Sequence, residues 1–122
     1  MMDGRIDFVN EVADWNINRD NLRYSPSLEY SLLDEEVNEY MEAGITGDLV
    51  GQADALADIA VVALGGLTKL CNGNVLAVQD ILLAVTAANN TKSSTKDSKG
   101  KITKPTNFVG PERMIKDILD DC

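Results

Sequence analysis

Histidine is absent from the 122-residue chain. Its absence excludes Ser-His-Asp and Cys-His catalysis, histidine metal sites, and the Glu-x-x-His pairs of carboxylate-bridged di-iron bundles. Any acid–base or metal chemistry must therefore use carboxylates, lysine or tyrosine. The two cysteines, Cys71 and Cys122, are too few for a disulfide framework, so we expect a reducing cytoplasm.

Secretory and membrane signals are also lacking. The N-terminus, MMDGRIDF, has no apolar run. The most apolar stretch, residues 49–67, contains Asp54 and Asp58, which argues against a membrane span. The net charge of −9 argues against bulk electrostatic binding to a nucleic-acid polymer or an anionic membrane. We therefore expect a cytoplasmic protein that binds neither a nucleic-acid polymer nor a membrane.

What the chain has is apolar residues at helical spacing over most of its length. We predict four main helices and a short last helix that begins at Pro111; the main helices cover residues 5–18, 28–43, 48–70 and 75–91. The fold class predicted for residues 1–122 is all-α, a single domain built as an antiparallel helical bundle. Because a chain of this size has a modest stability margin, we expect oligomerisation to complete the bundle.

The predicted helix ends follow from local signals. The serine after Pro26 is a candidate cap for the second helix, Gly44 and Gly47 are expected to end it, and Asp48 is a candidate cap for the third. Residues 91–106 are predicted to form a polar loop rich in Lys and Ser, which is ordered alone only with difficulty.

Charge is distributed unevenly along the chain. Residues 28–58 hold nine of the twenty acidic residues, and residues 92–116 hold seven of the eleven basic ones. An acidic half and a basic tail could together face one ligand that carries both a metal ion and phosphates.

Glutamates crowd one sector of the second helix. At 100° per residue, Glu35, Glu36, Glu39 and Glu42 fall within about a third of a turn. One interpretation is a solvated face, with the core formed on the opposite side by Leu33, Val37, Tyr40 and Met41.

The third helix favours a different interpretation. It is apolar nearly all round, yet Asp54 and Asp58 lie one turn apart on one face with no Lys or Arg within ten residues. An unpaired buried carboxylate is costly. Either one or both of these residues point to the end of the bundle or accept backbone hydrogen bonds, or both helices direct carboxylates to one cavity where a divalent cation balances them. With oxygen ligands only, that cation is expected to be Mg2+, with Mn2+ as a substitute.

The fourth helix supplies a possible counterpart. Asn89 and Lys92 continue its apolar stripe at the C-terminal end, where a cation is favourable in any case. Together with the following Lys/Ser loop, they would suit the phosphates of a nucleotide. A solvated loop is the alternative.

At these residues the sequence resembles a known family. EEVNE (35–39), followed after 14 residues by DALAD (54–58) in an apolar helix, is similar to the MazG-like, all-α nucleoside triphosphate pyrophosphohydrolases. The short phage and bacterial members labelled phosphoribosyl-ATP pyrophosphohydrolase-like also have segments similar to DALADIAVVALG and AANNTKSSTKDSKGKITKPTNFVGPE. The resemblance covers about residues 28–113.

The resemblance implies a homodimer or homotetramer that hydrolyses a nucleotide between the α- and β-phosphates, releasing a monophosphate and pyrophosphate. By position it implies Glu36, Glu39 and Asp58 as magnesium ligands and Glu35 as the residue that orients or deprotonates the attacking water. It also implies phosphate contacts from four residues: Asn89, Lys92, Lys101 and Lys104.

One position departs from the family pattern. Ala55 stands where the family has a glutamate, and Asp54 is the neighbouring carboxylate that could help to hold metal. This departure supports an alternative, a non-catalytic helical module that binds a nucleotide or a protein. Trp15 and Tyr24 are candidates for stacking on the base, although for Trp15 packing in the core or an interface is the favoured alternative.

Overall fold

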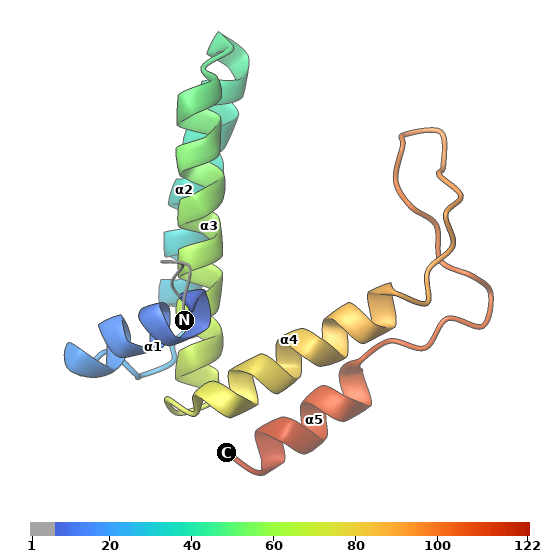
Figure 1. The fold of residues 1–122 in the computed structure, drawn as a ribbon. Helices are drawn as coiled ribbons and strands as arrows, with labels where there is room; N and C mark the ends of the chain where they lie inside the picture. Colours follow the sequence, from blue (N-terminus) through green and yellow to red (C-terminus); the bar gives the residue numbers. More distant parts are fainter. Residues whose placement is uncertain (1–6) are drawn as a thin grey trace, which may run out of the picture. The chain divides into compact units, whose positions relative to one another are not determined.

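The computed structural model describes residues 7–122, and these residues form five α-helices and no strand, with 67% of them helical. The predicted all-α helical bundle is confirmed. The chain divides into two compact units, Met1–Val75 and Leu76–Cys122 (Figure 1), and each unit is described by itself.

The first unit contains three helices, α1 (Phe8–Asn18), α2 (Pro26–Thr46) and α3 (Leu49–Leu70). Both α1 and α2 pack against α3. The α2–α3 pair is an antiparallel hairpin: Glu29 near the start of α2 meets Lys69 near the end of α3, and Gln52 Nε2 donates to the Ala43 carbonyl oxygen (3.5 Å) at the opposite end. This hairpin brings two distant stretches of sequence face to face.

Local capping explains where the helices of the first unit begin. Asp7 caps α1 by accepting from the Asn10 N–H (3.3 Å), so the helix begins at Phe8. The predicted start, residue 5, lies outside the described residues. The predicted Asp48 cap is confirmed, because its side chain accepts from the Gly51 N–H (2.9 Å).

The predicted bounds of the second helix were too narrow. Ser25, rather than Ser27, is the N-cap, because Pro26 occupies the first helical position, where its missing N–H costs nothing. Gly44 lies inside the helix, which ends at Thr46, and the following Gly47 adopts φ 71°. A left-handed residue of this kind terminates a helix and suits glycine.

One stripe of α2 faces α3 at helical spacing. Glu29 is buried, and Leu32, Leu33, Glu36 and Ala43 are half-buried. By contrast, Val37 and Met41 are exposed, so the interpretation that places them in the core is wrong. Two glutamates therefore lie within the buried stripe of this helix.

By length and composition alone, α3 could cross a membrane. Its mean hydropathy is 1.4, and 22% of the apolar window is buried. A core helix of a soluble protein meets the same criterion, so this observation is weak evidence for a membrane.

The second unit contains most of α4 (Val75–Asn89), and α5 (Glu112–Asp120). Four residues of α4 are buried: Ala77, Val78, Ile81 and Ala84. The helix ends at Asn89, two residues before the predicted end. Pro111 is the N-cap of α5 rather than its first helical residue.

The segment between α4 and α5 is ordered by its own hydrogen bonds. Asp97 accepts from the N–H groups of Lys99 (2.8 Å) and Lys101 (3.0 Å), and Gly100 completes the turn with φ 83°. An isolated bridge joins Lys96 to Ile102. The predicted loop is therefore a hydrogen-bonded turn in this structure.

Candidate metal centre

Three carboxylates converge between α2 and α3. Glu36 and Glu39 lie one turn apart on α2, and Asp58 lies opposite them on α3. One oxygen from each of the three lies within 4.8 Å of the others. Glu36 and Asp58 are half-buried, and Glu39 is exposed. The cluster therefore has one side toward the helix interface and one side open to solvent.

The environment of Glu36 opposes its negative charge. Burial raises the pKa of the Glu36 carboxyl above its ordinary value, and repulsion from Glu39, Asp58 and Glu35 raises it further. Among the described residues, Glu36 Oε2 is buried without a hydrogen-bond partner. No lysine or arginine in that part of the chain lies within 4.0 Å of the cluster. Within the described residues, no ion pair therefore compensates the charge of the cluster.

These residues fit a hard divalent cation. Carboxylate oxygens are the ligands that Mg2+ and Mn2+ prefer, and one or two carboxylates together with substrate phosphates and water usually suffice. A cation would also interact with Glu36 Oε2, the buried oxygen that has no hydrogen-bond partner among the described residues. Glu36, Glu39 and Asp58 are the residues that could hold it.

The structure separates Asp54 from this group. Asp54 is exposed and is not one of the three convergent carboxylates, whereas Ala55 is only 2% exposed. Around α3, Ala55 lies about 100° from Asp54, and of these two neighbouring residues only Ala55 is buried. The cluster in this structure therefore has three members.

The predicted water partner, Glu35, lies beside the cluster. Its side chain is exposed, and its charge is one of those that raise the pKa of Glu36. An exposed carboxylate next to a cation site can accept a proton from water. The described geometry is compatible with this role.

The four predicted phosphate contacts lie in the second unit. Asn89 is the last residue of α4, and its side chain is exposed, as are those of Lys101 and Lys104. Lys92 is half-buried. The ammonium groups of Lys92 and Lys104 both lie against the Phe108 ring, at 5.8 and 5.2 Å from its centroid. Within this unit, two positive charges therefore lie against one aromatic ring.

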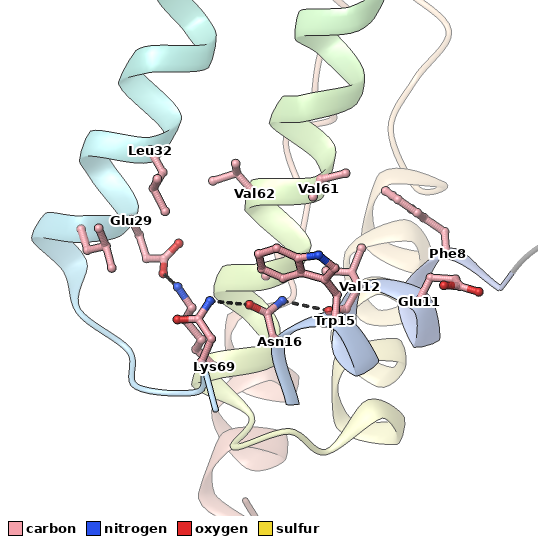
Figure 2. Close-up of a pocket in the computed structure, with 13 residues that line it drawn as sticks. Phe8, Glu11, Val12, Trp15, Asn16, Glu29, Leu32, Val61, Val62 and Lys69 are labelled. Atoms are coloured by element: carbon pink, nitrogen blue, oxygen red, sulfur yellow. Dashed lines mark hydrogen bonds and ion pairs between the residues drawn. The ribbon is translucent and has the colours of Figure 1, made fainter. Parts of the chain in front are cut away.

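A pocket of about 580 Å³ lies among α1, α2 and α3 (Figure 2). Trp15 lines it and is 53% exposed, so it is not a core residue of the described chain. The Arg19 guanidinium lies 4.4 Å from the centre of the indole, and its Nη1 donates to the Trp15 carbonyl oxygen (3.1 Å). Tyr24, the other stacking candidate, does not line this pocket.

Sequence reasoning missed the ion pair at the edge of this pocket. Glu29 and Lys69 are 7% and 6% exposed, and their side chains pair directly. A signal was present, because Glu29 is seven residues before Glu36 and so lies on the same helix face. Lys69 is the nearest lysine after the apolar stretch and carries the compensating charge.

Comparison with protein-family models gives no match, and no curated protein matches the chain. Fold and site alone therefore define the class of protein. It is an all-α protein with a three-carboxylate cluster between two antiparallel helices.

Proposed function

We propose that the protein is a magnesium-dependent nucleotide pyrophosphohydrolase that cleaves between the α- and β-phosphates. The observation that carries this proposal is the convergence of Glu36, Glu39 and Asp58 with no cation among the described residues to balance them. The resemblance of EEVNE and DALAD to the MazG-like family supports the same reaction.

In this proposal the carboxylates have two roles, cation binding and proton acceptance. Glu36, Glu39 and Asp58 hold the cation, which neutralises phosphate oxygens and lowers the pKa of water when bound. Glu35 orients the attacking water and accepts its proton on a carboxylate oxygen. Four residues of the second unit are proposed to contact phosphates: Asn89, Lys92, Lys101 and Lys104.

The test is a panel of nucleoside triphosphates and phosphoribosyl-ATP, assayed for pyrophosphate with Mg2+ and again with a chelator. We expect pyrophosphate release that requires Mg2+ and falls about 100-fold or more in Asp58→Asn, because several kcal/mol of charge stabilisation is lost. Asp34→Asn is the matched control, since Asp34 is an exposed α2 carboxylate outside the cluster. Full activity in Asp58→Asn would refute the site.

A non-catalytic module that binds a nucleotide or a protein is the second candidate. The observation that favours it is the burial of Ala55 on the interface side, which leaves three carboxylates where the family pattern implies four. Nucleotide binding without product in the same panel would support this module over the enzyme.

We also propose that two copies associate through the turn end of the α2–α3 hairpin. Three large apolar side chains there are strongly exposed: Ile45 (81%), Leu49 (77%) and Val50 (81%). Exposed apolar clusters of this kind mark association surfaces. Light scattering should give a dimer or tetramer for the wild type and a smaller species for Val50→Glu; a wild type that is monomeric at every concentration would refute this.

A further inference from the structure

The walls of the pocket among α1, α2 and α3 suit a flat aromatic ligand. Apolar side chains from all three helices surround it, including Phe8, Leu32 and Val62. Trp15 lines the pocket and is 53% exposed, and the Arg19 guanidinium lies over its indole ring. Stacking on an indole is tolerant of the kind of base, because every base has a π-face.

A buried ion pair adds polar specificity to these apolar walls. Glu29 Oε1 accepts from Lys69 Nζ, and both side chains line the pocket. Glu29 Oε2 has no hydrogen-bond partner among the described residues. In Figure 2 this oxygen is turned away from Lys69. The pocket therefore offers a carboxylate oxygen on a side chain that is nine-tenths buried and paired with a lysine through its other oxygen.

The nearby amides cannot replace this acceptor. Asn16 Nδ2 donates to the Val12 carbonyl oxygen (2.8 Å), and Asn16 Oδ1 accepts from Asn21 Nδ2 (2.7 Å). Asn16 is thus occupied on both sides of its amide. Glu11 also lines the pocket but is exposed, so Glu29 is the buried carboxylate among the lining residues.

The pocket lies next to the carboxylate cluster on both helices. Leu32 precedes Glu36 by four residues on α2, and Val62 follows Asp58 by four residues on α3. Four residues of helix rise about 6 Å. Because the helices are antiparallel, both steps run in the same direction, from the pocket toward the cluster. A sugar and a phosphate can span that separation.

We propose that this pocket holds the nucleobase and that Glu29 selects bases with an exocyclic amino group; that the ligand is a nucleotide rests on the proposed function. An ionised carboxylate only accepts hydrogen bonds. An amino group supplies the donor, as in cytosine, adenine and guanine. In uracil the ring N–H lies between two carbonyl oxygens, which would be brought against the negative carboxylate. Glu29 is therefore a specificity-determining residue.

The single tryptophan of the chain makes the pocket measurable without turnover. Trp15 fluorescence is titrated with cytidine and uridine, and with guanosine and inosine, in the absence of metal. Nucleosides carry no phosphates, so repulsion from the carboxylate cluster does not contribute. We expect saturable quenching by at least one amino-bearing nucleoside, with Kd about tenfold or more below that of its matched partner, as for a hydrogen bond to a charged group.

Substitution of Glu29 tests the selection itself. Glu29→Gln should bring the Kd ratio of the matched pair close to one, because a carboxamide offers a donor as well as an acceptor. Should the unpaired Lys69 unfold this variant, the double variant Glu29→Gln/Lys69→Met removes both buried charges and serves in its place. Asp34→Asn should keep the wild-type ratio.

Two results would overturn the proposal: no nucleoside quenches Trp15, or uridine and inosine bind as well as their partners. Its failure is distinguishable from that of the proposed function. Pyrophosphate release without Trp15 quenching would overturn the base pocket alone. Selective quenching without pyrophosphate release would leave the pocket as a binding site and refute the enzyme.

Discussion

Glu29 and Glu36 are two glutamates on the same face of α2, seven residues apart, in opposite electrostatic surroundings. Glu29 is paired with Lys69 of α3. Glu36 faces Asp58 of α3 and Glu39 of its own helix, and its Oε2 is buried without a partner in the described chain. Among the described residues, Glu29 therefore has a positively charged partner and Glu36 has none.

The position of each residue along its helix strengthens the contrast. Glu29 lies in the first turn of α2 and Lys69 in the last turn of α3, where the helix dipoles favour a negative and a positive charge respectively. Glu36 lies in the middle of α2 and receives no such support. The helix dipoles thus support the charge of Glu29 and not that of Glu36, which agrees with the different roles proposed for the two residues.

The largest expected effect on stability comes from breaking the Glu29–Lys69 pair. Lys69→Met leaves Glu29 buried without its cation, and removing one partner of a buried pair typically costs about 3–5 kcal/mol. For a domain of this size, that is a large part of the free energy of unfolding. Urea unfolding followed by circular dichroism measures the loss.

The double variant Glu29→Gln/Lys69→Met is the control for this prediction. Because it removes both charges, we expect it to recover most of the lost stability. Equal stability of Lys69→Met and the wild type would show that Glu29 does not depend on Lys69, and the contrast with Glu36 would fail.

A smaller effect is expected at Glu36. The pKa of its carboxyl is raised in the folded protein, so folding favours the protonated form. This contribution to stability is fully present below the unfolded-state pKa, about 4.3, and is lost as the pH rises through the folded-state pKa. In metal-free protein, the unfolding temperature of Glu36→Gln should therefore rise relative to the wild type as the pH increases from 4 to about 7.

Magnesium should reverse this difference. A cation bound to ionised Glu36 stabilises the folded state by mass action, and more so at neutral than at acidic pH, where protons compete. Thermal unfolding with and without Mg2+ should show a shift for the wild type at neutral pH and a much smaller one for Glu36→Gln. Equal shifts for the two proteins would remove Glu36 from the metal site.

Much of the fold could be predicted because helical periodicity and capping are local. Apolar spacing predicted all five helices, and Asp48 was identified as a cap from sequence alone. The end of α2 could not be predicted correctly, because only the backbone conformation shows that Gly47, and not Gly44, is left-handed. Such a choice depends on the turn that follows.

The cluster could be predicted in part for a similar reason. Glu36 and Glu39 share a face at helical spacing, and Asp58 is conspicuous in an apolar helix. The exposure of Asp54 could not be predicted, because it depends on which side of α3 meets α2. The Glu29–Lys69 pair joins residues forty positions apart, which only the register of the hairpin brings together.

The smallest effect on stability is expected at Glu35. Its substitution therefore tests a role in proton transfer separately from a role in metal binding. Its side chain is exposed, so Glu35→Gln should change the free energy of unfolding by no more than about 0.5 kcal/mol. Its charge is the last of the causes that raise the pKa of Glu36, so the stabilisation by Mg2+ should persist. As the proposed proton acceptor, however, its loss should lower magnesium-dependent pyrophosphate release by about 10²–10⁴-fold. If activity and magnesium stabilisation instead fell together, Glu35 would act as a metal ligand alongside Glu36, and the division between the two neighbours would be wrong.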